Sequence, residues 1–213
     1  MSGRAMNKQK MILLGAVFAA LLSLAACGNP QVPFQQGPLY GASIGGPFTL
    51  TDQSGKPRRY DEFVGKFKIV YFGYTNCPDI CTPDVQNLMA GLKLFESANP
   101  EYVEKIQPLF ITIDPQRDTP EVLTQFVRAF HPRLIGLTGT QAQIDAVTKS
   151  FAIVASRVEG SRPDAYLMSH SQTPYLMLPD GKPLALMPTD NPETDVNEGS
   201  PQAVAAELAK WVR

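Results

Sequence analysis

Residues 71–84 read Tyr71-Phe-Gly-Tyr-Thr-Asn-Cys77-Pro-Asp-Ile-Cys81-Thr-Pro-Asp84. The run from Phe67 to Tyr74 is apolar and rich in aromatic and β-branched side chains, which predicts a buried strand. From about Pro83 the apolar residues recur at helical spacing, which predicts a helix. Both cysteines therefore lie where a strand gives way to a helix. The N–H groups and positive potential at a helix start favour thiolate over thiol.

The spacing of the two cysteines bears on their chemistry. Residues four apart on one helical face have Cβ atoms about 5–6 Å apart, whereas a relaxed disulfide needs roughly 3.5–4.5 Å. The spacing therefore favours a soft metal bridging both sulfurs over a permanent cross-link. Because Pro78 places Cys77 just outside the helix, a disulfide formed by local adjustment stays open. A pair of buried thiols without chemistry is the remaining alternative.

Composition limits the class of protein. The chain has 213 residues, of which 44% are hydrophobic and 18% charged, as in a globular protein. The formal net charge is −1, so nothing indicates binding to nucleic acid or to an anionic membrane surface.

The first residues have the pattern of a targeting segment. A basic start is followed by the apolar run Met11–Leu22 and then by Leu24-Ala-Ala-Cys27. This resembles the lipobox of bacterial lipoproteins, in which Cys27 becomes the lipid-modified N-terminus. The alternative is an uncleaved anchor, for which the run is short, since a span needs roughly 20 apolar residues. Either way the rest of the chain lies outside the cytoplasm, where thiols meet oxidants.

Three segments follow from these patterns. Residues 1–27 are predicted to be a lipoprotein signal peptide that ends at the lipidated cysteine. Residues 28–45, rich in Pro, Gly and Gln, are predicted to be a tether. Residues 46–213 are predicted to form the domain.

Strands alternate with helices along this domain, which predicts an α/β sandwich around a central mixed sheet. Thr119 and Thr140 are expected to cap two of the helices. The other expected elements are a hairpin over 48–60, strands over 108–114 and 134–137, a second hairpin over 175–186, and a last helix over 201–212.

Four separated motifs resemble the Sco/SenC family, in the family's order, over roughly residues 46–213. They are Cys77-Pro-Asp-Ile-Cys81, Asp114-Pro-Gln-Arg-Asp-Thr-Pro120, Phe130-His-Pro-Arg-Leu-Ile-Gly-Leu-Thr-Gly139, and His170-Ser171 followed by Tyr175-Leu-Met-Leu-Pro-Asp-Gly181. The resemblance implies a thioredoxin-like three-layer sandwich with an N-terminal β-hairpin and a family-type insertion. It also implies a copper-binding protein that helps to assemble cytochrome c oxidase.

The family's metal ligands, two cysteines and one histidine, correspond to Cys77, Cys81 and His170. Two thiolates and an imidazole suit Cu(I), and Cu(II) is left open. Three ligands leave the ion accessible for transfer, whereas structural zinc normally takes four. In a thioredoxin-like fold the loop that carries His170, just before the last hairpin, lies against the first strand–helix turn.

Other residues are weaker candidates. Asp79 and Asp114 are candidates for hydrogen bonds that orient the ligands, although an aspartate in a turn is commonly solvated or capping. The family's acidic residue before the histidine is Ser169 here, so the hydrogen bond that orients the imidazole is expected to differ.

The other histidine and two methionines are expected to be structural. His131 is expected to bond the last carbonyls of a helix. Met168 and Met177 are soft donors too, but packing is the expected use of both.

The leading hypothesis is a non-enzymatic copper chaperone tethered on the outer side of the bacterial inner membrane. Its partner is expected to be the cytochrome c oxidase subunit that carries the copper site, or another periplasmic copper protein. The alternative is a thiol–disulfide oxidoreductase in which Cys77 attacks a partner's disulfide and Cys81 resolves it. A peroxidase-like enzyme is a distant third. Copper capture needs His170, whereas disulfide exchange does not.

Overall fold

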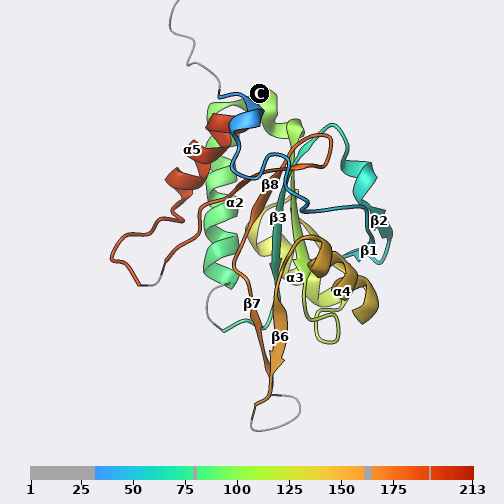
Figure 1. Cartoon of the computed structure of the whole chain (residues 1–213). Helices are drawn as coiled ribbons and strands as arrows, with labels where there is room; N and C mark the ends of the chain where they lie inside the picture. The colour runs from blue at the N-terminus through green and yellow to red at the C-terminus, as the bar shows by residue number, and fades with distance from the viewer. Residues whose placement is uncertain (1–31, 79–80, 161–164, 192) are drawn as a thin grey trace, which may run out of the picture. The chain divides into compact units, whose positions relative to one another are not determined.

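The computed structural model in Figure 1 describes residues 32–78, 81–160, 165–191 and 193–213. The predicted signal peptide with Cys27, and also Asp79, lie outside these ranges. Val32–Arg213 is one compact unit. The unit therefore begins earlier than residue 46: Leu39 donates a main-chain hydrogen bond to Leu184, and the ring of Phe34 packs against Phe67.

A mixed sheet of seven strands forms the centre of the domain, in the order β2-β1-β5-β4-β3-β8-β9. Strands β3, β4 and β5 are parallel, and β1 and β8 pair antiparallel with β5 and β3. Both β3 and β4 are buried along their whole length, as the apolar runs predict. The strands are β1 (Thr49–Asp52), β2 (Pro57–Arg59), β3 (Phe67–Gly73), β4 (Ile106–Thr112), β5 (Ile135–Thr138), β8 (Tyr175–Met177) and β9 (Pro183–Leu186).

Helices cover both faces of the sheet, because successive side chains of a strand point to opposite faces. Tyr71 of β3 stacks with Phe110 of β4, which contacts Phe126 of α3. Phe72 instead packs against Phe151, directly after α4. Helices α2 and α3 thus cover one face and α4 the other. The helices are α2 (Cys81–Ala98), α3 (Pro120–Phe130), α4 (Gln141–Ser150), α5 (Pro201–Trp211) and the short 3-10 helices η2 (Phe34–Gln36), η3 (Tyr60–Phe63) and η4 (Pro100–Lys105).

Helices α2 and α5 lie side by side (Figure 1). A glycine lets them approach this closely: a Cβ on Gly91 of α2 would lie 2.4 Å from Cβ of Val204 on α5. This contact holds α2, whose first residue is Cys81, closely against α5.

The predicted elements are present, and the caps at Thr119 and Thr140 are confirmed, since both hydroxyls accept a hydrogen bond from the first helical turn. The sequence missed a two-stranded ribbon of β6 (Ala155–Val158) and β7 (Leu167–His170). The expectation that His170 lies in a loop is therefore wrong, because it is the last residue of β7 and pairs with Ala155. In Figure 1 the ribbon extends past the end of β3.

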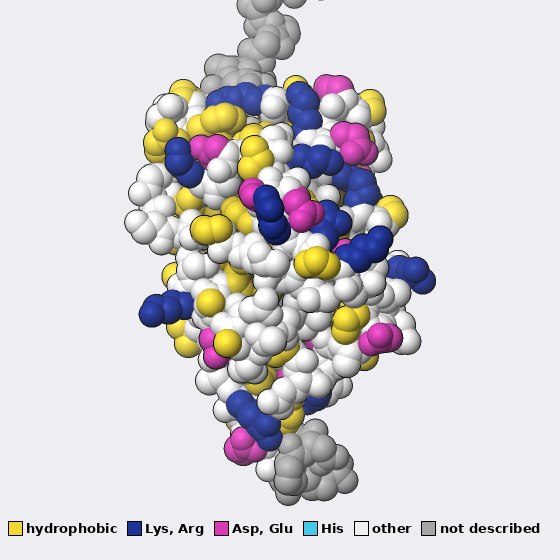
Figure 2. Space-filling model, turned by 90° about the vertical axis from the view of Figure 1, so that its right-hand side faces the viewer, with side chains coloured by type: hydrophobic (Ala, Val, Ile, Leu, Met, Phe, Trp, Pro, Cys, Tyr) yellow, Lys and Arg dark blue, Asp and Glu magenta, His cyan; other side chains and the backbone are white. Residues whose placement is uncertain are grey.

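On the face of the molecule in Figure 2, Lys and Arg side chains are interspersed with Asp and Glu, mostly in the upper half of the view. Positive and negative side chains thus lie next to one another on that face. In the described part of the chain, no helix combines the length and apolar character that a membrane crossing requires.

Candidate functional site

Cys81 and His170 meet at the end of β3, although they are far apart in the sequence. Cys81 is the first residue of α2, and its Sγ lies 3.1 Å from Nε2 of His170. The other ring nitrogen, Nδ1, lies 2.9 Å from the carbonyl oxygen of Ser171. Because a carbonyl can only accept, Nδ1 carries the proton and Nε2 presents a lone pair to the sulfur. This is the tautomer that binds a metal through Nε2.

The carbonyl of Ser171 thus has the orienting role that an acidic residue at position 169 would have had. Ser169 itself is exposed. The ring of His170 is also held edge-on between Tyr71 and Tyr74, with ring centroids 6.5 and 6.2 Å away.

Cys77 lies in the loop between β3 and α2, outside the helix as Pro78 predicts. It is half-buried, whereas Cys81 is fully buried. Cys77 and His170 line one cavity of about 250 Å³ together with Met168. The side chain of Cys77 is within hydrogen-bond reach of Cys81 and of the Tyr74 hydroxyl.

Burial has the largest effect on the pKa of Cys81, the more deeply buried of the two thiols. It raises the pKa of Cys81, and the neighbouring Cys77 raises it further, while a hydrogen bond with Tyr71 lowers it. Burial of Cys81 therefore opposes the preference for thiolate that is expected at a helix start. Burial likewise lowers the pKa of His170, so the imidazole stays neutral.

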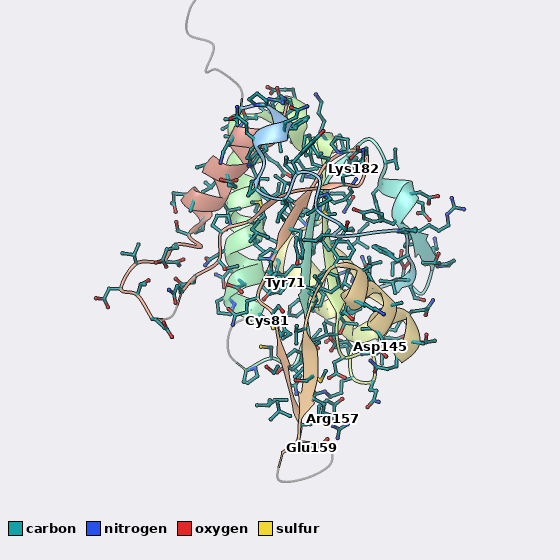
Figure 3. All side chains as sticks on the ribbon, in the orientation of Figure 1. Tyr71, Cys81, Asp145, Arg157, Glu159 and Lys182 are labelled. Carbon is teal, nitrogen blue, oxygen red and sulfur yellow. The ribbon has the colours of Figure 1, made fainter. Side chains whose placement is uncertain are left out.

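A buried tyrosine and aspartate lie behind Cys81. The hydroxyl of Tyr71 donates to Asp84 Oδ2 at 3.1 Å and also contacts the Cys81 side chain. Burial raises the pKa of Asp84 to about 6, and the hydrogen bond from Tyr71 opposes this shift. Figure 3 shows Tyr71 beside Cys81 at the start of α2.

Glycine ends β3 because the rings of Tyr71 and Phe110 and the Cys81 thiol fill the space beside it. A Cβ on Gly73 would lie 3.3 Å from Cys81 Sγ and 2.9 Å from the ring of Tyr71. After β3 the chain turns at Thr75, which is held by Asp118. The Asp118 side chain is fully buried and accepts hydrogen bonds from the amide and the hydroxyl of Thr75 at 3.0 and 2.6 Å. Asp118 thus fixes the start of the loop that carries Cys77.

Asp114, a predicted candidate for orienting the ligands, instead anchors the β6–β7 ribbon. It accepts a hydrogen bond from the Tyr166 hydroxyl at 2.8 Å and pairs with Arg117. Arg117 and Arg157 both lie over the ring of Tyr166, at 3.7 and 3.8 Å from its centroid. Because Tyr166 comes directly before β7, this cluster positions the strand that ends at His170.

The other histidine lies at the end of α3, as predicted, but with different partners. His131 accepts a hydrogen bond from the amide of Arg133 at 3.2 Å and faces Glu96 at 3.4 Å, rather than bonding the last carbonyls of the helix. Met177 is fully buried in the core, as predicted. Met168 is half-buried and lines the cavity with Cys77 and His170.

The donor atoms fit a soft metal, although they are not yet arranged around one. Among the described residues, no three His, Cys, Asp or Glu side chains are grouped closely enough to hold an ion. A metal bonded to sulfur at about 2.3 Å and to nitrogen at about 2.0 Å keeps these two atoms roughly 3.7 Å apart in a three-coordinate site. The Cys81–His170 pair, now at 3.1 Å, needs to open by only about half an ångström.

Sequence reasoning missed the supporting residues of this site: Tyr71, Tyr74, Asp84 and Asp118. Asp118 lies within a motif that was quoted only for its resemblance. Tyr71 and Asp84 are the first and last residues of the stretch 71–84. An aspartate in the first turn of a helix is common and does not by itself indicate a site. Their pairing depends on which face of β3 meets α2, which the local pattern does not give.

Comparisons with known proteins agree with this architecture. Residues 36–209 match the model of a protein family described as SCO1/SenC. A SCO2-like protein of Rickettsia felis is 39% identical over 191 residues, which are 88% of this chain and 90% of that protein. The mitochondrial protein SCO2 of Saccharomyces cerevisiae is 38% identical over 174 residues, which are 81% of this chain but only 57% of the yeast protein.

Solved structures give the same result. Bradyrhizobium japonicum ScoI with copper bound has a TM-score of 0.67 at 34% identity, over 79% of this chain and 99% of that one. BsSco, described as having a disulfide switch and as a member of the Sco family of cytochrome c oxidase assembly proteins, has a TM-score of 0.53 at 26% identity, over 67% of this chain and 82% of that one. The fold is thioredoxin-like, as the sequence predicted.

Proposed function

The chain belongs to the SCO1/SenC family, and on that premise we propose that it is a copper chaperone for cytochrome c oxidase assembly. It takes up Cu(I) through Cys77, Cys81 and His170. It then delivers the ion to the oxidase subunit that carries the copper site, or to another extracytoplasmic copper protein.

The observation that carries this proposal is the orientation of His170. Its Nδ1–H is bonded to the Ser171 carbonyl at 2.9 Å, and its Nε2 faces the Cys81 sulfur at 3.1 Å. A thiol and a neutral imidazole thus meet with their donor atoms converging, and a second thiol lines the same cavity. Such soft and borderline donors select Cu(I).

The burial of the site suits a Cu(I) ion that is bound only temporarily and then released to a partner. The inner thiol holds its proton tightly, since burial raises the pKa of Cys81. Copper uptake must displace that proton, and the Tyr71 hydroxyl, which donates to Asp84 in this structure, can turn to donate to the resulting thiolate. The protonated thiol in turn favours release to a partner with more acidic ligands.

The test is the His170→Ala variant of the full chain, measured by competition with a Cu(I) chelator at fixed pH. Loss of an orienting partner commonly costs 10–100-fold in metal affinity, so loss of a ligand is expected to weaken Cu(I) binding by at least about 100-fold. His131→Gln is the matched control, since His131 contacts Glu96 and Arg133 far from the thiols. Wild-type affinity in His170→Ala contradicts the proposed ligand set.

The arrangement of the two cysteines also supports thiol–disulfide exchange as a second candidate function. Cys77 is half-buried and Cys81 is buried behind it, which suits an attacking thiol and a resolving one. The Cys77 thiolate attacks a partner's disulfide and forms a mixed disulfide, and one partner sulfur leaves. The Cys81 thiolate then attacks Cys77 Sγ, which releases the second partner thiol. The partner gains two electrons and the chain keeps a Cys77–Cys81 disulfide.

His170→Ala separates the two functions, because neither sulfur changes. Reduction of a model disulfide by this variant is expected to stay near the wild-type rate, while Cys77→Ser abolishes it. A wild-type chain that reduces disulfides but binds no Cu(I) favours the second function over the first.

A lipid on Cys27 is proposed to hold the domain on the outer face of the membrane. Support comes from the basic, apolar and small-residue order that ends in Leu24-Ala-Ala-Cys27. Mass spectrometry of the mature protein is expected to find a diacylated N-terminal cysteine, and Cys27→Ser is expected to accumulate as precursor. Normal cleavage without lipid in the wild type contradicts the anchor.

A further inference from the structure

Met168 lies on the same side of the β6–β7 ribbon as the histidine of the site. Along β7 exposure alternates: Leu167 and Ser169 are exposed, whereas Met168 and His170 are half-buried. Residues two apart on a strand share a face. The side chains of Met168 and His170 therefore lie on the same face of β7, the face that meets the loop carrying Cys77.

Tyr74 links Met168 to the outer thiol. The hydroxyl of Tyr74 is within hydrogen-bond reach of both the main chain of Met168 and the side chain of Cys77. The ring of the same tyrosine packs edge-on against His170, 6.2 Å between centroids. One side chain thus contacts the outer cysteine, the histidine and the residue that carries the thioether.

Space around Met168 allows its side chain to move. It lines the cavity of about 250 Å³ that contains Cys77 and His170. It also lines a second cavity of about 240 Å³, between α4 and Arg157 on the ribbon. Met177 is different, because it is fully buried and its methyl group is packed beside Gly45. Met168 packs against the core from its edge and is only partly buried, and the long side chain of a methionine adapts readily.

We propose that Met168 is a further copper ligand of this chain, a thioether that contacts Cu(I) at the mouth of the site beside Cys77 and His170. This inference rests on the proposed function. A thioether is a soft, uncharged donor that suits Cu(I). It adds affinity without adding a proton to be displaced, and it gives the ion a weak fourth contact.

Met168→Leu tests this ligand, because leucine has about the same volume and lacks only the sulfur. Cu(I) binding to the full chain is expected to weaken by about 10-fold, the lower end of the range for changes around a metal ligand. Met177→Leu is the matched control and is expected to keep wild-type affinity. Circular dichroism melting of both variants checks that each is folded.

Direct contact is tested with selenium. The full chain is labelled with selenomethionine, loaded with one equivalent of Cu(I), and measured by X-ray absorption at the selenium edge. A copper neighbour of selenium is expected in the wild type and in Met177→Leu, and is expected to be lost in Met168→Leu.

The outcomes separate the ligand from the chaperone. Cu(I) bound with no copper neighbour at selenium overturns the Met168 ligand and leaves the chaperone function intact. Weaker binding in Met168→Leu without that neighbour also overturns it, since the side chain then acts by packing. A wild-type chain that binds no Cu(I) overturns both proposals.

Discussion

The two ends of strand β3 both bury polar groups, but with different kinds of partner. At the amino end, Lys68 is 1% exposed. Its ammonium donates to the main-chain carbonyls of Phe63 and Pro179 at 3.4 and 3.2 Å, and it lies over the ring of Tyr60. Fixed main-chain atoms hold this charge in place.

At the carboxyl end, the partners are side chains that can gain, lose or exchange bonds. Tyr71 connects Asp84 with Cys81, and Cys81 in turn faces His170. Figure 3 labels Cys81 at this end of the strand and Lys182 at the other. Burial of an ionisable group is common to both ends, so burial alone does not identify the site. The difference is that the buried groups at the carboxyl end bond to side chains, which can exchange partners, whereas Lys68 bonds to main-chain carbonyls, which cannot.

The largest expected difference between the two ends is in copper affinity. Cys81→Ser keeps the size of the side chain but replaces a soft sulfur by a hard oxygen. Cu(I) affinity measured by chelator competition is expected to fall by at least about 100-fold. Lys68→Met, at the other end of β3, is expected to keep wild-type affinity. An equal loss in both variants indicates a general loss of the fold and removes the distinction.

A smaller effect is expected from a single hydroxyl at each end. Tyr71→Phe removes the hydroxyl that donates to Asp84 and that can turn to a Cys81 thiolate, so Cu(I) affinity at neutral pH is expected to fall by about 10-fold. Tyr60→Phe makes the same change at the amino end, where the hydroxyl donates to the Gly181 carbonyl at 3.1 Å.

Both tyrosine variants are expected to lose about 1 kcal/mol of unfolding free energy, the usual value of one hydrogen bond. Only Tyr71→Phe is expected to bind copper less tightly. Equal copper affinities in the two variants contradict a role for Tyr71 in stabilising the Cys81 thiolate.

The sequence predicted the carboxyl end of β3 well, because its signals are local. The apolar run, the cysteine spacing and the helical pattern after Pro83 all fall within a few residues of one another. The caps at Thr119 and Thr140 are local signals too. Each depends on one side chain and the first turn after it.

Features that depend on distant contacts were missed. Strand β6 is exposed along its whole length, so it has no alternating apolar pattern to indicate a strand. Residues 32–45 look like a tether by composition, yet Gly45 bonds to Ser150 and Phe34 packs against Phe67. The Tyr71–Asp84 pair needs the packing of α2 on β3. In each case the determining contact is with another element.

The ribbon that carries His170 offers the next test. Asp114→Asn removes the charge that pairs with Arg117 and weakens the hydrogen bond from Tyr166. Amide hydrogen exchange along β7 is expected to speed up, and Cu(I) affinity to fall by less than about 10-fold. Asp145→Asn is the control. Asp145 is exposed on α4, and among the contacts described its carboxylate bonds only Gln141 in the same helix. Unchanged exchange in Asp114→Asn contradicts the anchoring role.

The smallest expected effect is a pH dependence at the amino end. Burial lowers the pKa of Lys68 from 10.5 to about 8. Above pH 10.5 the amine is neutral in both the folded and unfolded states, and below pH 8 it is charged in both. Between these values the unfolded state binds one proton more. The free energy of unfolding therefore rises with pH in this window, by at most about 1.4 kcal/mol per pH unit from this group.

Urea denaturation at several pH values between 8 and 10.5 measures this slope in wild type and in Lys68→Met. The variant is expected to have a flatter dependence on pH, because methionine takes up no proton. Lys66→Met, two residues earlier at the surface where Lys66 pairs with Glu104, is expected to keep the wild-type slope. Since all three chains share the same cysteines and tyrosines, the difference between their slopes isolates Lys68. Parallel slopes in wild type and Lys68→Met mean that the carbonyls of Phe63 and Pro179 fully replace water around the ammonium, so that folding leaves the pKa of Lys68 unchanged.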